Sequence, residues 1–88
     1  MAFPPRILHE TIVVWTTLKQ RYAGCLIVLL QDNVYSSIGI DALALHAVAN
    51  LPLVKATVPY IYFTVPTFEH VLHRCLHSGF RVVIGRPA

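Results

Sequence analysis

The chain has 88 residues, of which 56% are hydrophobic and 12% are charged, and its formal net charge is +3. A chain of this length predicts one domain spanning residues 1–88, with one small core. Apolar residues exceed the usual ~45–50% and charged residues fall well below the usual ~25%, so the composition excludes a strongly charged surface and predicts a dimer or a domain docked on a larger protein.

Membrane spans and disulfide frameworks are also excluded by the pattern. The uninterrupted apolar run Cys25–Leu30 has six residues, far fewer than the ~18–20 that a spanning helix needs. The first residues lack a signal-peptide core and cleavage site, so we expect a cytoplasmic protein that does not enter a membrane. Cys25 and Cys75 lie in apolar settings without metal-ligand spacing, which predicts buried thiols in a reducing compartment.

The first half of the chain predicts a helix and then a buried strand. Pro4 and Pro5 indicate a short extended lead-in. Apolar residues then recur at helical spacing, at Leu8, Ile12, Trp15, Leu18 and Tyr22. β-branched residues in Thr11–Thr17 disfavour a helix, but the period and the polar close at Lys19–Arg21 favour one. After Gly24, the segment Cys25–Leu30 is too uniformly apolar for an exposed helix and predicts a central strand buried on both faces.

A polar corner follows that strand. Gln31–Asn33 has the composition of a tight turn and predicts a hairpin that returns through Val34–Ser36. A second helix is predicted over Asp41–Asn50, where Asp41 is favourable to the helix dipole. Leu53–Val58 and Tyr60–Val65 both look extended, and Pro59 between them makes one of the two an edge strand or a bulge.

The last third of the chain predicts a helix and a strand. The helix opens at Pro66-Thr67, with Thr67 as a cap, and ends at Ser78-Gly79. Its inward residues are predicted to be Phe68, Leu72, Cys75 and Leu76. The strand is Phe80–Gly85. The expected fold class is therefore α/β (α+β), a mixed sheet of about five strands with helices packed on it, in the order α-β-β-α-β-β-α-β.

No group of residues in the sequence has the composition and spacing of a catalytic site. His70, His73 and His77 share one face of the third helix without a carboxylate or cysteine beside them, which predicts a solvent-facing stripe and no metal site. The carboxylates are dispersed, Ser36-Ser37 lacks a glycine elbow, and neither type of nucleotide-binding glycine loop is present. We expect a protein that is not an enzyme and needs no cofactor.

The predicted strand Tyr60–Val65 carries two tyrosines. Strand alternation puts Tyr60 and Tyr62 on one face and Ile61 and Phe63 on the other. Tyrosines in this arrangement either stack on nucleic-acid bases or simply fill a sheet, and the sequence leaves both alternatives open.

Two stretches carry a family resemblance. VPTFEHVLHRCLHSGFRVVIG, with its Val65-Pro66 pair, Glu69, Gly79 and Arg81–Ile84, resembles the last helix and strand of the N-terminal mismatch-recognition domain of MutS. LIVLLQDNVYSSIGIDA resembles that family's apolar strand, Gly-Asp corner, Phe-Tyr-Glu and Gly-Glu-Asp-Ala helix start. The likeness covers roughly Glu10 to Ile84.

The resemblance implies a small mixed α/β domain that meets duplex DNA from the minor-groove side. In that family the Phe of Phe-x-Glu wedges beside a mispaired base and the Glu hydrogen-bonds it, and such wedges kink weakly paired duplexes. Val34 and Ser36 stand at these two positions here, so the aromatic ring and the carboxylate are both replaced. Gly85-Arg86-Pro87 likewise replaces the family's Cys-Glu-Gln.

We therefore expect a non-catalytic DNA-binding module, with contacts from Val34, Tyr35 and Ser36 and with Lys55 or Arg86 as phosphate partners. The alternative is a protein–protein interaction or oligomerisation module of the same fold that has lost DNA binding. The high apolar content and the replaced Phe and Glu favour the alternative. Because no connector, clamp or ATPase follows Ala88, mismatch repair by this chain alone is not expected.

Overall fold

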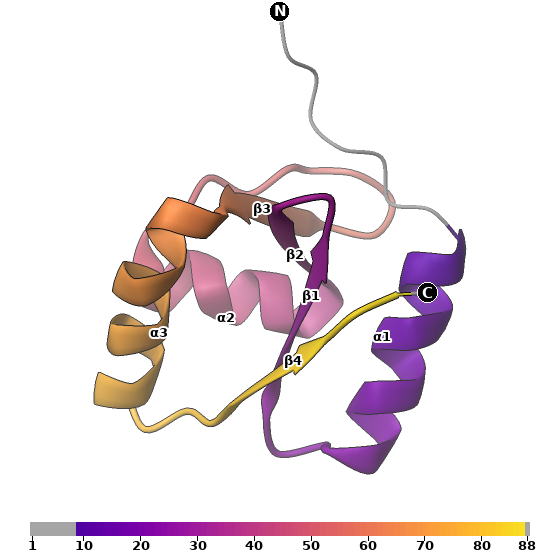
Figure 1. Ribbon diagram of the computed structural model, residues 1–88, viewed down its shortest axis with the longest axis horizontal. Helices are drawn as coiled ribbons and strands as arrows, with labels where there is room; N and C mark the ends of the chain where they lie inside the picture. The colour runs from indigo at the N-terminus through magenta and orange to yellow at the C-terminus, as the bar shows by residue number, and fades with distance from the viewer. Residues whose placement is uncertain (1–8, 88) are drawn as a thin grey trace, which may run out of the picture.

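The computed structural model describes residues 9–87, which form helices on both sides of a mixed four-stranded sheet (Figure 1). The elements are α1 (His9–Arg21), β1 (Leu26–Gln31), β2 (Val34–Ile38), α2 (Gly39–Ala49), β3 (Tyr60–Thr64), the 3-10 turn η1 (Val65–Thr67), α3 (Phe68–His77) and β4 (Val82–Gly85). The mixed α/β class is confirmed. The extended lead-in expected at Pro4 and Pro5, and the first position of the helical stripe at Leu8, lie outside the described residues.

The sheet has the strand order β3-β2-β1-β4. β1 lies in its interior, antiparallel to β2 and parallel to β4. Leu26 and Val28 of β1 pack into the core formed with α2 and α3. The alternate residues Ile27 and Leu29 are also buried, and they project to the opposite face, which α1 covers. The prediction of a strand buried on both faces is confirmed, and it explains why β1 has no polar alternation.

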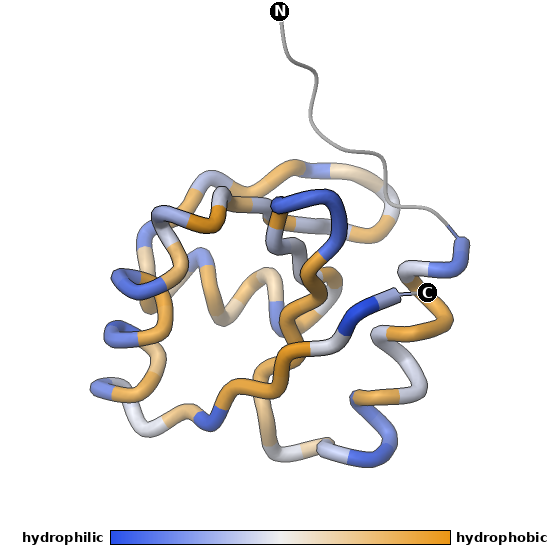
Figure 2. Tube along the Cα trace, in the orientation of Figure 1, coloured by the Kyte–Doolittle hydropathy of each residue, from blue (hydrophilic) through white to orange (hydrophobic). Residues whose placement is uncertain are grey.

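The corner between β1 and β2 is a two-residue hairpin turn. Gln31 pairs with Val34, and Asp32 and Asn33 between them have φ values of 53° and 62°. Left-handed backbone at both central positions gives the turn the twist of the flanking strands, and Asn and Asp tolerate it better than most residues. The predicted hairpin is confirmed. Figure 2 shows this corner as a hydrophilic turn at the end of the apolar strand β1.

The prediction of a fifth strand was wrong. Leu53–Val58 makes only one bridge to the sheet, where Val54 exchanges both backbone hydrogen bonds with Tyr60, and residues 55–58 are exposed. The flanking prolines, Pro52 and Pro59, have no N–H to donate to a ladder. The order is therefore α-β-β-α-β-α-β, and β3 is an edge strand.

The helix ends differ in detail from expectation. α2 begins at Gly39, and Asn50 at its C-terminus takes the left-handed conformation with φ 56°. Gly79 likewise has φ 88° just after α3, so the predicted glycine cap is confirmed. Thr67 makes no side-chain cap to α3, since its hydroxyl lies 3.1 Å from that of Thr64.

The inward face of α3 was only partly predicted. Val71 and Cys75 are its buried residues, and they define the line that packs on α2 and the sheet. Leu76, expected to face inward, is 56% exposed. It is one residue beyond Cys75, and one residue turns a helix by about 100°, which carries Leu76 off the buried line. Among the helices of residues 9–87, none is long and apolar enough to cross a membrane.

Candidate functional site

The side of the sheet facing α1 carries two of the expected contact residues and both tyrosines of β3. Ser36 pairs with Leu29 in β1 and with Tyr62 in β3, and Leu29 lies near the α1 side chain of Leu18 beside Gly85. Strand alternation therefore places six side chains on this side of β2 and β3, and one of them, Ile38, is buried. We call the other five the tyrosine face: Val34, Ser36, Tyr60, Tyr62 and Thr64.

The tyrosine face is partly open. Thr64 is exposed and the other four members are half-buried, whereas Ile61 and Phe63 on the opposite side of β3 are buried. The predicted alternation of the aromatic strand is thus confirmed. α1 packs mainly over β1, with further contacts to β2 and β4. The half of the sheet that includes β3 accordingly keeps aromatic rings within reach of solvent.

Tyr35 does not belong to this face. Its side chain is 7% exposed and is stacked between two rings, with centroids 5.3 Å from Phe63 and 4.5 Å from Phe68. The expectation that Tyr35 contacts DNA needs correction, because a ring held between two others in the core cannot also stack on a base. Its neighbours Val34 and Ser36 point the other way because successive strand residues alternate between the two sides.

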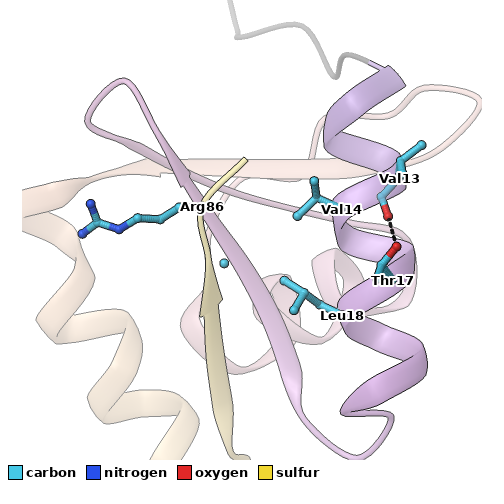
Figure 3. Close-up of a pocket in the computed structure, with 6 residues that line it drawn as sticks. Val13, Val14, Thr17, Leu18 and Arg86 are labelled. Carbon is cyan, nitrogen blue, oxygen red and sulfur yellow. Dashed lines mark hydrogen bonds between the residues drawn. The ribbon is translucent and has the colours of Figure 1, made fainter. Parts of the chain in front are cut away.

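Lys55 and Arg86 do not converge on one site. Lys55 is exposed and follows Val54, whose bridge to Tyr60 sets it at the β3 edge of the sheet. Arg86 is exposed and follows β4 at the opposite edge. Figure 3 shows the Arg86 side chain directed away from α1. Of the two expected phosphate partners, only Lys55 is therefore adjacent to the strand that carries the tyrosines.

The most elaborate polar contact in the described residues was missed by the sequence reasoning. Asp41, at the start of α2, is buried at 2% exposure. Its Oδ1 accepts a hydrogen bond from Lys19 Nζ at 2.7 Å. Its Oδ2 accepts from Trp15 Nε1 at 3.1 Å and from the backbone N–H of Ile27 at 3.0 Å. Lys19 also donates to the carbonyl of Cys25 at 2.7 Å.

This arrangement is a clamp that ties α1, β1 and α2 together. Both carboxylate oxygens are engaged by donors from the protein, so the group is satisfied as a buried charge must be. A signal was present in the sequence, because Asp41 is the sole charged residue between Asp32 and Lys55. An isolated charge in an apolar stretch needs a partner, and the lysine that supplies it lies on another helix, which spacing alone does not reveal.

The remaining candidates for chemistry are occupied or exposed. Ser37 is fully buried and its Oγ donates to the carbonyl of Ile27 at 2.6 Å, so this hydroxyl has a structural partner. His70, His73 and His77 are exposed on α3, with the last two rings 6.1 Å apart, as the predicted solvent-facing stripe requires. Within residues 9–87, no group of three or more His, Cys, Asp or Glu side chains is placed to hold a metal ion.

An apolar groove of about 270 Å³ lies between α1 and the end of β4, lined by Val13, Val14, Thr17, Leu18, Gly85 and Arg86 (Figure 3). The Thr17 hydroxyl donates to the Val13 carbonyl at 2.9 Å. Small-molecule sites need a few convergent polar groups to orient a ligand. With Thr17 engaged within its own helix and the Arg86 side chain turned away, the lining supplies no such set.

No protein-family model matches this chain, and no curated protein does. The likeness to the MutS mismatch-recognition domain therefore rests on the residues quoted above and remains a prediction.

Proposed function

We propose that this protein is a non-catalytic DNA-binding module, similar to the MutS mismatch-recognition domain, that contacts exposed bases through the tyrosine face. The observation that supports this most is the position of Val34 and Ser36. They stand where that family has its wedge and its hydrogen-bonding carboxylate, and they lie on the same side of the sheet as the half-buried rings of Tyr60 and Tyr62.

The chemistry of this face suits bases that are weakly paired or unpaired. Stacking of one base on an aromatic side chain contributes about 1–3 kcal/mol and does not depend on the base. The Ser36 hydroxyl can donate or accept a hydrogen bond at a base edge. Among the expected contacts, Lys55 is the one cation adjacent to β3, so electrostatic attraction to the phosphate backbone of DNA is weak and we expect modest affinity. Because stacking does not depend on the base, we also expect little discrimination between DNA sequences.

The test is fluorescence anisotropy with a labelled single strand, its matched duplex and the same duplex carrying one mismatch. Tyr62→Ala should weaken binding about 5- to 150-fold, the equivalent of one lost stacking contact. Tyr22→Ala is the control, because Tyr22 is an exposed tyrosine that follows α1 and does not belong to the tyrosine face. Equal losses in the two variants, or no wild-type binding at about 1 mM protein, would contradict the proposal.

Salt dependence tests where the phosphates lie. Each phosphate contact contributes about −0.9 to the slope of log affinity against log salt on duplex DNA and about −0.7 on a single strand. Lys55→Ala should reduce the slope by about one contact. Arg86→Ala removes the same charge at the opposite edge of the sheet and should leave the slope unchanged. Identical effects would indicate a diffuse electrostatic association.

The second candidate function is a protein–protein interaction module. It is supported by the number of large apolar side chains that are exposed within residues 9–87, among them Val13, Ile40, Leu43, Val58, Leu76 and Ile84. A small domain that presents this much apolar surface commonly buries part of it against a partner. If the protein is such a module, the replacement of the family's Phe and Glu by Val34 and Ser36 accompanies a loss of DNA binding. The anisotropy experiment should then detect no binding.

A further inference from the structure

The histidines of α3 form a group of metal-binding side chains that the proposed function does not use. His73 and His77 are four residues apart, and their ring centroids are separated by 6.1 Å with an angle of 10° between the ring planes. Residues four apart on a helix are neighbours one turn away from each other, with Cβ atoms about 5–6 Å apart. Both side chains are exposed, so an ion from solvent can reach both rings.

We propose that His73 and His77 chelate one divalent transition-metal ion, with water in its remaining coordination positions. Imidazole nitrogen suits Ni²⁺, Cu²⁺ and Zn²⁺. Two histidines four residues apart on one helix face are also the pair that holds zinc in the His-Glu-x-x-His metalloproteases. The corresponding segment here is HRCLH, which keeps both ligands and has Arg74 in place of the glutamate that acts as general base. The pair therefore has the spacing for binding a metal without the base for hydrolysis.

The distance between the rings suits one shared ion. Each nitrogen–metal bond is about 2.0–2.1 Å long, so two nitrogens on one ion are at most about 4.2 Å apart. Ring nitrogens lie off the ring centroid, so rings with centroids 6.1 Å apart can bring one nitrogen each within that span. Rotation about the exposed side-chain bonds achieves this, and the helix backbone does not need to move.

The neighbouring side chains neither block the pair nor add a third ligand. Arg74 Nε donates to the carbonyl oxygen of Val48 at 3.1 Å, which holds the guanidinium toward α2. His70 is seven residues before His77, about 10.5 Å along the helix axis, which is too far for these two to share an ion. Within residues 9–87 no group of three such ligands is placed on one ion. The sequence reasoning rejected a metal because it required a carboxylate or cysteine beside the histidines, and a two-histidine chelate requires neither.

Binding at this pair has a structural consequence and a defined selectivity. His77 is the last residue of α3, so an ion held by both rings ties the end of the helix to the preceding turn. Because this geometry depends on the helical backbone, the ion binds the folded state more tightly than the unfolded state and stabilises it. Mg²⁺ and Ca²⁺ prefer oxygen ligands and should not bind here.

The inference is independent of the proposed DNA binding. Val71 and Cys75 of α3 belong to the core on the side of the sheet that includes Phe63, whereas the tyrosine face is on the other side. Tyr62→Ala should therefore bind the metal like wild type, and His77→Ala should retain whatever affinity for DNA the wild type has.

Isothermal titration calorimetry of the tag-free chain with Ni²⁺ tests the site. Ni²⁺ is preferable to Cu²⁺ because it does not oxidise the free thiols of the chain. Wild type should bind one ion, and His73→Ala or His77→Ala should each weaken binding at least about tenfold, because the second histidine binds the ion intramolecularly. His70→Ala is the matched control, since it removes an exposed histidine from the same helix and should leave the affinity unchanged.

Thermal unfolding followed by circular dichroism provides the second measurement. At about ten times its Kd, Ni²⁺ should raise the Tm of wild type by about 5–10 °C. The same Ni²⁺ concentration should raise the Tm of His73→Ala much less, and spectra without metal show whether each variant is folded. No Ni²⁺ binding at about 1 mM, equal losses of affinity in His70→Ala and His77→Ala, or unchanged affinity in His73→Ala would each overturn the proposal.

Discussion

Removal of the Asp41 carboxylate is the sharpest test of how this small domain holds together. The clamp joins three elements through one side chain, because Lys19 and Trp15 come from α1 and the Ile27 N–H comes from β1. Asp41→Ala leaves the two N–H donors without an acceptor inside the protein. It also leaves the Lys19 ammonium with one partner, the Cys25 carbonyl.

The expected loss is large for a chain of this size. Removing one partner of a buried ion pair costs about 3–5 kcal/mol. The Lys19 side chain is 18% exposed and can turn partly to water, which favours the lower end of that range. A domain of this size has a total stability of about 4–13 kcal/mol. Asp41→Ala therefore removes a large part of it, and Asp41→Asn, which keeps one acceptor oxygen, should cost about 1–3 kcal/mol.

Urea denaturation followed by circular dichroism measures these differences. Glu69→Gln is the control, because Glu69 is an exposed carboxylate in the first turn of α3 and should change stability by less than about 0.5 kcal/mol. A double-mutant cycle with Lys19→Met and Asp41→Asn should show a coupling of about 1–3 kcal/mol. Additive effects in that cycle, or an Asp41→Asn variant as stable as wild type, would refute the reasoning.

Two further predictions concern single side chains. Burial raises the pKa of the Cys75 thiol above its ordinary value of 9.0, so the folded state binds this proton more tightly than the unfolded state. Stability from this group is complete below pH 9 and declines above it, and titration of urea midpoints should show a smaller decline in Cys75→Ala. Asn33 has φ 62°, so Asn33→Ala should cost about 1 kcal/mol while Asn33→Gly should not. Equal midpoints for the two Asn33 variants would contradict the turn geometry.

The sheet interior and its corner were predictable because their signals are local. Cys25–Leu30 is uniformly apolar, and Asp32-Asn33 supplies the residues that tolerate left-handed backbone. Both statements need only neighbours in sequence. The third helix was equally accessible, since its start and its glycine stop are local features, but its inward face was set by contacts with α2 and the sheet.

The errors share a cause, which is dependence on residues distant in sequence. Leu53–Val58 has the composition of a strand, but the prolines at both ends and the lack of a second neighbour leave it with a single bridge. Tyr35 was expected to contact DNA together with Val34 and Ser36, but alternation along the strand puts its side chain on the opposite side. Which side of β2 is buried in the core depends on elements distant in sequence, such as the Phe68 ring of α3 that stacks on Tyr35. The Asp41 clamp joins positions separated by 22 and 26 residues, and no local pattern predicts such pairs.

The pairing of β2 with β3 also changes which residues the resemblance to MutS implies for base contact. Two residues separated by one along a strand share a side, so Val34 and Ser36 keep the relative placement of the family's Phe-x-Glu pair although their chemistry differs. Directly across the ladder from Ser36 is Tyr62. Position 34 thus lacks an aromatic ring, but Tyr62 supplies one on the same face from the neighbouring strand β3. On the proposed function, Tyr62 supplies the stacking surface and Val34 the apolar edge, which is why Tyr62→Ala, and not a substitution at Tyr35, separates a DNA-binding domain from one that retains only the scaffold.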